Sequence, residues 1–283
     1  MEDVKDAITG EDDVDVDERS IPMQPVSSAH EDWLDRPFKN FQVASSHNSY
    51  LHSLQFLSSA GTRGVKQAMN KGARMVELDV YARNIHAGDF EPVVAHGEVV
   101  NDLHLKVTSA CPFEEFIKCI AEEAWANTDD PFFLCIENVT AGENETGDRM
   151  ADAVQQHMPE ERLLPHEMNL HETPFRDLLG KLIIINGRDC GGRWEQQWTV
   201  DFDRMGGFSN TDMADGPDVL DVNNICRVYP SGNMSGLMSN NFDPEPFLGK
   251  ASFVALNYQT HDENLEKAIN HFEGCSFKLK DDC

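Results

Sequence analysis

The amino-acid sequence predicts an α/β domain built on a parallel sheet, and a closed eight-stranded barrel is its leading architecture. Short, continuous apolar runs of the kind found in buried parallel strands recur along the chain. Most of these runs are separated by segments long enough for a helix. The chain has 283 residues, 40% of them hydrophobic, which is enough for one large core. An open, doubly wound sheet is the second choice.

Seven stretches have the apolar composition of strands that are buried on both faces. They cover residues 41–45, 74–80, 92–96, 132–138, 181–186, 225–230 and 252–258. A closed barrel needs an eighth strand, which we expect near residues 162–165. The segment 187–224 is rich in glycine, aspartate and asparagine, and we interpret it as a long connection.

Helical periodicity occupies several intervals between these strands. The clearest helix is 112–126, which opens with Pro112 and places large apolar side chains on one face. Three further helices are expected at 62–71, 148–158 and 262–272.

Charge and cysteine content limit the classes of function. Residues 1–30 are acidic and poor in large apolar side chains, which predicts a disordered tail before a single domain at 31–283. The formal charge of −27 argues against binding to nucleic acid. Seven cysteines without paired spacing, no secretory signal and no apolar run of transmembrane length indicate reduced thiols in the cytoplasm.

Polar residues follow or end four consecutive predicted strands. In strand order they are His47 and Asn48, then Glu77 and Asp79, then His96, then Glu137. The carboxyl ends of parallel strands form one rim of a barrel, and active sites lie on that rim. We therefore expect these side chains to share one site.

The acidic residues of this group indicate a metal site. Glu77 and Asp79 are two positions apart in one strand, so both point to the same side of the sheet. Together with Glu137 they would raise one another's pKa values unless a cation compensates. Carboxylates plus the Asn48 amide suit a hard cation, and calcium fits best, with magnesium left open. Singly, each residue also fits a turn cap or a surface ion pair.

The two histidines suit chemistry on a phosphate group. One imidazole can donate a hydrogen bond to a phosphoryl oxygen, and the other can protonate a leaving oxygen near neutral pH. A metal that lowers the pKa of a hydroxyl nucleophile would complete the set. The pattern therefore indicates cleavage of a phosphodiester.

Several motifs resemble the catalytic core of the eukaryotic phosphoinositide-specific phospholipases C. In the family's order they are "SSHNSYL", "GARMVELDVY", "PVVAHG", "FFLCIEN", "CRVYPSG" and "SFVALNYQT". They divide the chain into an X-like half at 41–188 and a Y-like half at 205–280. The resemblance implies a distorted TIM-type (β/α)8 barrel that uses Ca2+ to cleave inositol phospholipids into diacylglycerol and inositol phosphate.

The resemblance also implies a role for each matching residue. The calcium ligands correspond to Asn48, Glu77, Asp79 and Glu137. His47 corresponds to the histidine that stabilises the phosphoryl transition state, and His96 to the general acid for the diacylglycerol leaving group. Glu77 is our choice for the base that activates the inositol 2-hydroxyl. A cyclic phosphodiester forms first, and water then opens it.

The resemblance is less complete among the residues that bind the inositol head group of the lipid. Arg227 and Tyr229 correspond to the residues that bind a ring phosphate and stack on the inositol. Arg188 and Ser209 correspond to two further phosphate contacts, whereas Asn186 stands where the family has a lysine. Because one basic contact is missing, phosphatidylinositol and its monophosphate are expected to be as suitable as the bisphosphate.

Two other functions stay open. Glycerophosphodiester phosphodiesterases share the barrel and a run similar to residues 72–96, but they begin with His-Arg-Gly where this chain has "SHNSY". A non-catalytic, calcium-dependent phosphoinositide-binding module is the second alternative. For the leading function, the expected partner is an inositol phospholipid at a membrane surface. The protein itself is expected to be a cytoplasmic, peripherally membrane-associated monomer.

Overall fold

A computed structural model gives the fold of the chain. It describes residues 20–52, 59–100, 103–106, 108–138, 144–164, 168–186, 191–194, 199–201, 209–230 and 240–281. Most of the predicted acidic tail, residues 1–19, therefore lies outside the described residues.

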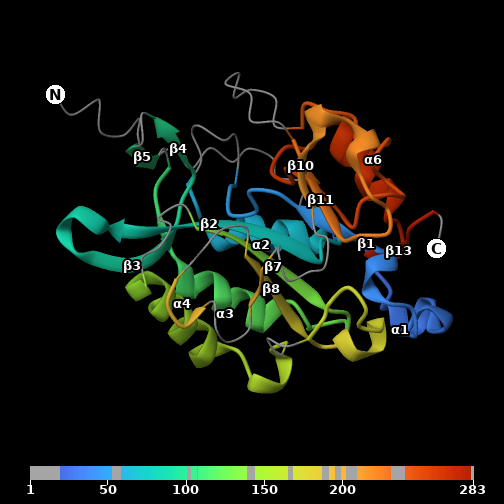
Figure 1. Cartoon of the computed structure of the whole chain (residues 1–283), viewed down its shortest axis with the longest axis horizontal. Helices are drawn as coiled ribbons and strands as arrows, with labels where there is room; N and C mark the ends of the chain where they lie inside the picture. The colour runs from blue at the N-terminus through green and yellow to red at the C-terminus, as the bar shows by residue number, and fades with distance from the viewer. Residues whose placement is uncertain are drawn as a thin grey trace.

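Eight parallel strands form the centre of the described structure (Figure 1). They are β1 (Phe41–Ser46), β2 (Met75–Asn84), β7 (Phe132–Asn138), β8 (Leu182–Asn186), β9 (Thr199–Asp201), β10 (Ser209–Asp212), β11 (Cys226–Tyr229) and β12 (Phe253–Leu256). Their spatial order is β10-β11-β12-β1-β2-β7-β8-β9, and each neighbouring pair is parallel. The order follows the chain around a ring, because the last strand, β12, pairs with the first, β1. No pairing among the described residues joins β9 to β10, so the barrel is interrupted there.

One predicted strand has a different role from the one expected. The stretch 92–96 contributes to β3 (Asp89–Val94), which runs antiparallel to β2 and is not part of the ring. The turn between the two strands is only a few residues long, and such a short connection permits an antiparallel hairpin but no parallel crossover. The remaining short strands are β4 (Gly97–Val100), β5 (Leu103–Lys106), β6 (Cys111–Pro112) and β13 (Phe277–Leu279).

The missing barrel strands lie in the segment that we interpreted as a connection. Of the stretch expected to form the eighth strand, the described residues 162–164 contribute an isolated bridge between Leu163 and Leu182 and no strand. Instead, β9 and β10 complete the set of eight within 187–224. Both are very short and carry polar residues, "TVD" and "SNTD", so neither shows the apolar run that identifies a buried strand.

The four predicted helices are present. They are α2 (Thr62–Asn70), α3 (Phe113–Glu123), α4 (Asn144–His157) and α6 (Glu263–His271). Helix α2 ends before Gly72, whose φ of +90° favours glycine, and Asp262 caps α6 by accepting a hydrogen bond from the backbone N–H of Leu265 at 2.9 Å. Helices α3 and α4 contact each other on one side of the sheet (Figure 1).

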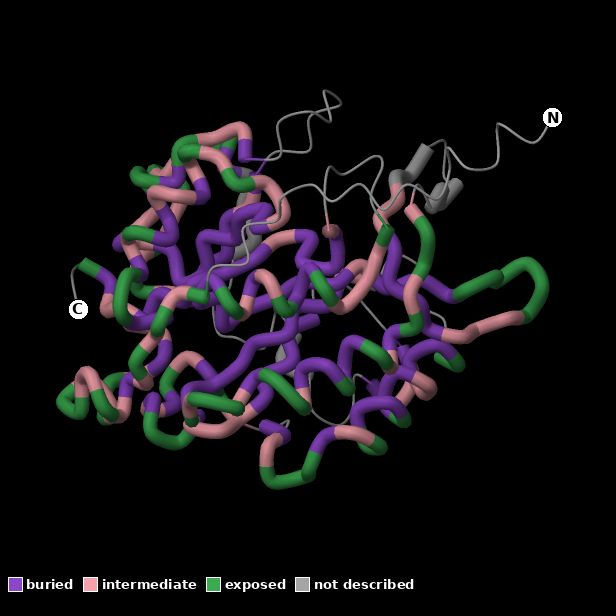
Figure 2. The backbone as a smooth tube through the Cα atoms, turned by 180° about the vertical axis from the view of Figure 1, so that it is seen from behind, coloured by how far each residue is buried: buried purple, intermediate pink, exposed green. Residues whose placement is uncertain are grey.

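Two apolar layers hold the barrel together. One lies between the sheet and the helices and includes Val76, Leu134 and Ile120. The other fills the barrel interior around Phe133 and Phe253, whose rings lie 5.3 Å apart. Figure 2 shows buried residues concentrated along the central strands and exposed residues concentrated on the outer turns.

Residues 20–30 correct the predicted tail, because they pack against the body of the domain. The N–H of Ile21 donates to the carbonyl of Asn70 at 2.8 Å, and that of Gln24 donates to Gly274 at 2.9 Å. The short helix α1 (Val26–Ala29) places Val26 in the core. A few apolar residues therefore anchor a segment that its overall composition predicts to be disordered.

Candidate active site

The barrel interior changes from apolar to charged along the strands. In β2, Met75 belongs to the interior core, and Glu77 and Asp79 follow it on the same side of the sheet. In the adjacent β7, Cys135 lies beside Glu77 and Glu137 lies beside Asp79 in the strand register. The charged residues therefore lie toward the carboxyl ends of the strands.

The three predicted carboxylates come together. Glu77, Asp79 and Glu137 each offer an oxygen, and these oxygens all lie within 4.8 Å of one another. Glu77 is buried, whereas the other two are partly exposed. The sequence interpretation placed Glu137 two strands from β2, but β7 is the direct neighbour of β2 because β3 lies outside the ring.

Arg227 is the cation that the structure places against this cluster. Its guanidinium forms ion pairs with Glu77 and, at 3.2 Å, with Glu137. Only 1% of the Arg227 side chain is exposed. The residue expected to bind a ring phosphate therefore balances carboxylate charge inside the barrel.

One guanidinium does not balance three carboxylates. Burial raises the pKa of Asp79 well above its usual value, and the charges of Glu77 and Glu137 raise it further. Burial also acts to raise the pKa of Glu77, but Arg227 and then His47 outweigh it, so that this pKa lies below its usual value. The excess negative charge and the all-oxygen donor set fit one hard divalent cation such as calcium.

His47 and Asn48 follow β1 and face the same cluster. The His47 Nε2 atom lies 3.3 Å from Glu77 Oε2, and the Asn48 N–H donates to that same oxygen at 2.9 Å. Asn48 has a φ of +47°, a left-handed conformation that asparagine tolerates better than most residues. The His47 ring also stacks on Tyr229, with ring centroids 5.9 Å apart.

His96 reaches the site by a route that differs from the expected one. We predicted it at the carboxyl end of a parallel strand, but β3 returns antiparallel along β2. The hairpin pairs Val94 with Val80, and the Ala95 N–H donates to the Asp79 carbonyl at 3.2 Å. His96 therefore lies beside Asp79 because the chain folds back to it.

Sequence reasoning missed two polar residues of the site. The buried Tyr50 hydroxyl lies 2.7 Å from Asp79 Oδ2 and 3.0 Å from His96 Nδ1. Burial and then the Asp79 charge raise the pKa of Tyr50 well above its usual value, so its hydroxyl is protonated at neutral pH. Asn257 lies 3.2 Å from His47 Nδ1 through its Oδ1 atom. Asn257 follows β12 and would have been found by applying the strand-end criterion to the second half of the chain.

The remaining predicted substrate contacts are described only in part. Arg188 lies outside the described residues, and Ser209 is the first residue of β10. Asn186 is buried and accepts a hydrogen bond from the Trp194 Nε1–H at 2.7 Å.

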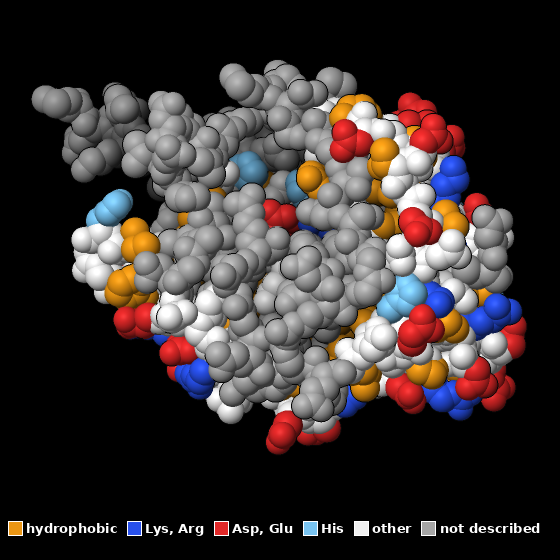
Figure 3. Space-filling view, viewed as in Figure 1, with side chains coloured by type: hydrophobic (Ala, Val, Ile, Leu, Met, Phe, Trp, Pro, Cys, Tyr) orange, Lys and Arg blue, Asp and Glu red, His pale blue; other side chains and the backbone are white. Residues whose placement is uncertain are grey.

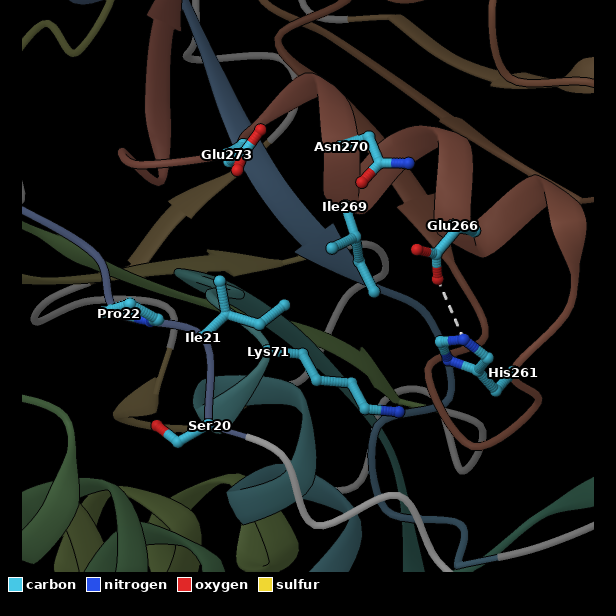
Figure 4. A pocket seen from close by; sticks show the side chains of 9 residues that line it. All are labelled: Ser20, Ile21, Pro22, Lys71, His261, Glu266, Ile269, Asn270 and Glu273. Carbon is cyan, nitrogen blue, oxygen red and sulfur yellow. Dashed lines mark ion pairs between the residues drawn. The ribbon is translucent and has the colours of Figure 1, made fainter.

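A cavity of about 250 Å3 lies elsewhere, beside helix α6 (Figure 4). Lys71 and Ile21 line it opposite the helix, and His261 pairs with Glu266 at its edge, 2.9 Å apart. None of the carboxylates or histidines of the rim lines this cavity. The predicted site residues at the rim therefore lie apart from this cavity.

The fold and the site together define a (β/α)-barrel protein with a carboxylate cluster and two imidazoles at the carboxyl ends of its strands. Residues 34–188 match the family model described as "Phosphatidylinositol-specific phospholipase C, X domain". This match covers more than half of the chain, and the chain therefore belongs to the phosphatidylinositol-specific phospholipase C X-domain family.

Individual proteins are similar to this chain in sequence or in fold. The chain is 29% identical to the zebrafish (Danio rerio) 1-phosphatidylinositol 4,5-bisphosphate phosphodiesterase delta-3-A, over 87% of this chain and 38% of that protein. The cuttlefish (S. officinalis) PLC21 crystal structure matches with a TM-score of 0.71 and 21% identity, over 88% of this chain and 38% of that one. A calcium-dependent phosphoinositol-specific phospholipase C from Pseudomonas sp. matches with a TM-score of 0.58 and 11% identity, over 91% of this chain and 97% of that one.

The matched proteins differ in activity and in length. The chain is also 29% identical to the mouse (Mus musculus) "Inactive phospholipase C-like protein 2", over 56% of this chain and 13% of that protein. It spans 38% of the length of the zebrafish relative. Proteins similar to this chain thus include both named phosphodiesterases and one named as inactive.

Proposed function

We propose that this protein is a calcium-dependent phosphoinositide phospholipase C, which cleaves inositol phospholipids to diacylglycerol and inositol phosphate. The observation that supports this proposal most is the meeting of three carboxylates from β2 and β7 with histidines from two separate loops. Membership in the phospholipase C X-domain family supports cleavage of inositol phospholipids as the reaction at this site.

In this proposal the rim carboxylates hold the metal. Its ligands are Asn48, Glu77, Asp79 and Glu137. When bound, calcium stabilises negative charge on the phosphate and lowers the pKa of the inositol 2-hydroxyl. Arg227 stays beside Glu77 and leaves the cluster with a net charge that one divalent ion balances.

In this proposal three residues of the chain each carry out one part of the reaction. Glu77 accepts the proton of the 2-hydroxyl as that oxygen attacks phosphorus. His47 donates a hydrogen bond to the phosphoryl oxygen as charge develops on it. His96 gives a proton to the leaving oxygen of diacylglycerol, which leaves a cyclic inositol phosphate that water opens in a second step.

The head-group side of the site lacks one of the family's basic contacts, so we expect phosphatidylinositol and its monophosphate to be as suitable as the bisphosphate. Asn186 occupies the position of a family lysine, and its amide oxygen accepts a hydrogen bond from Trp194. An uncharged amide offers a ring phosphate no charge-assisted contact. In our proposal Tyr229, and Arg188 and Ser209 by motif position, contribute the remaining contacts to the inositol ring.

The substrate is a membrane lipid, so we place the protein peripherally at a membrane surface. None of the helices among the described residues has the length and apolar composition needed to cross a bilayer. Figure 3 shows acidic and basic side chains interspersed over the described part of one face. With a formal charge of −27, attraction to an anionic surface has to come from local features and not from net charge.

A product assay tests this function. The purified chain is incubated with vesicles of phosphatidylinositol, its monophosphate or its bisphosphate, in calcium or in chelator, and the products are resolved by class. Diacylglycerol with cyclic inositol phosphate, formed only in calcium, is the expected result. Release of glycerol phosphate would instead support a glycerophosphodiester phosphodiesterase. Calcium-dependent vesicle binding without product would support the non-catalytic alternative, for which the inactive mouse relative is a precedent.

A further inference from the structure

Tyr50 joins the predicted metal ligands to the predicted general acid. Its hydroxyl lies 2.8 Å from Asn48 Oδ1, 2.7 Å from Asp79 Oδ2 and 3.0 Å from His96 Nδ1. The side chain is fully buried. Its three partners come from the loop after β1, from β2 and from the segment after β3, so one hydroxyl connects three parts of the site.

The number of available hydrogens decides the direction of these bonds. A tyrosine hydroxyl has one hydrogen to donate and two lone pairs with which to accept. When Asp79 is ionised, as it is in the cation-bound form proposed above, its oxygen and the Asn48 amide oxygen both accept, so the single hydrogen goes to one of them. His96 Nδ1 then has to carry its own hydrogen and donate it to the tyrosine oxygen.

This direction determines which nitrogen of His96 is available for catalysis. With Nδ1–H bound to Tyr50, Nε2 is the nitrogen that exchanges a proton with the substrate. The backbone limits the position of the residue as well, because the His96 N–H donates to Thr108 Oγ1 at 2.8 Å. Thr108 therefore holds the backbone of His96, whereas the contact with Tyr50 acts on its ring.

We propose that Tyr50 is a positioning residue, whose hydroxyl fixes the ring orientation and the tautomer of His96 and ties this histidine to Asp79. The proposal rests on the function proposed above, in which His96 is the general acid. The ring enters the first step as the imidazolium, with a hydrogen on each nitrogen. When the phosphorus–oxygen bond breaks, the Nε2 proton passes to the leaving oxygen and the ring becomes the neutral Nδ1–H tautomer. The Nδ1 proton stays on the ring, hydrogen-bonded to Tyr50, and water returns a proton to Nε2 in the second step.

The leaving group distinguishes this role from a structural one. Tyr50→Phe removes only the hydroxyl and should lower kcat on phosphatidylinositol by about tenfold to a hundredfold. An inositol phosphate ester with an aryl leaving group needs no general acid, so its kcat should change less than about twofold. Tyr258→Phe, which removes another buried hydroxyl, is the matched control and should leave both rates unchanged. Equal loss on both substrates, or no loss on either, would overturn the proposal.

A second measurement does not depend on turnover. Nitrogen-15 NMR of the histidine rings, with the His96 signals assigned from a His96→Gln spectrum, reports which nitrogen of the neutral ring carries hydrogen. With calcium present, we expect the Nδ1–H tautomer in the wild-type protein and a mixture in Tyr50→Phe. A wild-type ring protonated at Nε2 would overturn the role of Tyr50. If the wild-type protein releases no product from any lipid, the proposed function fails, while the NMR result still decides the role of Tyr50.

Discussion

The two ends of strand β2 bury charge in opposite ways. At the amino end, Arg74 lies just before the strand and is surrounded by main-chain carbonyls. Toward the carboxyl end, Glu77 and Asp79 point into the barrel and meet a third carboxylate and Arg227. The buried charge at the amino end stabilises the fold, whereas the buried charges toward the carboxyl end are suited to binding a ligand.

The amino end is geometrically complete, and its buried guanidinium faces one buried carboxylate, that of Asp130. Arg74 donates to the carbonyls of Ala124, of Asp130 at 2.6 Å and of Pro131 at 3.2 Å. The Asp130 carboxylate in turn accepts the N–H of Val26 at 2.9 Å. Each donor there has an acceptor, which is typical of a structural contact.

The carboxyl end is incomplete by the same test. Three carboxylates face one guanidinium, and the pKa of Asp79 is raised by burial and by its two acidic neighbours. Such a cluster is stable in its ionised form only when a further cation is present. Both ends of β2 are buried, but only the cluster toward the carboxyl end keeps an unbalanced negative charge. This unbalanced charge, more than burial, identifies the candidate site.

The largest expected effect is loss of stability at the amino end. Arg74→Met removes the donor for three carbonyls and the counter-charge of Asp130, so the free energy of unfolding should fall by about 3–5 kcal/mol. Chemical denaturation measures it. The exposed Arg83→Met, which breaks a surface pair with Asp89, should change stability by less than about 1 kcal/mol. Equal effects of the two variants would remove the distinction between the ends.

Phospholipid turnover should fall when residues at the rim are substituted, and not when residues elsewhere are. His47→Ala and His96→Ala should each lower phospholipid turnover by at least about a hundredfold, as expected for groups that stabilise the transition state or transfer protons. Both should fold normally by circular dichroism. His157→Ala, which breaks a pair with Glu114 between α4 and α3, serves as the control. Turnover that survives in both rim variants would contradict the mechanism.

Stability at the amino end should depend on pH through Asp130. Burial is the main cause that raises the pKa of Asp130 to about 6. Below pH 4 its carboxyl group is neutral in both the folded and the unfolded state. Between pH 4 and 6 only the unfolded state loses the proton, so folding stability falls as the pH rises and then stays level.

Asp130→Asn keeps an acceptor for Val26 but has no charge. Its stability relative to wild type should therefore increase by about 2–3 kcal/mol from pH 4 to pH 7. Denaturant titrations at several pH values measure this difference. Asp129→Asn, which changes the exposed neighbouring residue, is the control, and its stability relative to wild type should change little over the same pH range. A constant difference between Asp130→Asn and wild type across this range would mean that Asp130 is ionised in the fold without a penalty.

The smallest effect should come from the rim in the absence of metal. Asp79→Asn removes one of the repelling charges, so in chelator its free energy of unfolding should rise by about 1 kcal/mol. Calcium should stabilise the wild-type protein further but should stabilise this variant much less. Thermal unfolding with and without calcium reports both changes. A variant that is less stable than wild type in chelator would argue against the excess negative charge.

Apolar patterns predicted most of the fold because they report burial. The runs in β1, β7, β8 and β12 and the apolar face of α3 carry that signal directly. Strands β9 and β10 carry no such signal, since each has three or four residues and their pairing depends on neighbours already in place. The packing of residues 20–30 depends on single anchors such as Val26, which composition does not reveal.

The site was predictable where strand ends determine position. Glu77, Asp79 and Glu137 follow from strand register, and His47 from its place after β1. The direction of β3 was not predictable from its apolar run, because parallel and antiparallel partners present the same side chains. The contacts of Tyr50 and Arg227 depend on distant chain segments meeting in the barrel, and no local pattern encodes them.

Calcium titration by calorimetry tests the central claim most directly, because it asks whether the rim carboxylates hold one divalent ion. The wild-type protein should bind one calcium ion, Glu137→Gln should bind it at least about tenfold more weakly, and Glu123→Gln, which changes an acid paired with Lys66 on the surface, should bind as wild type does. Absence of binding, or equal affinity in all three proteins, would contradict the account.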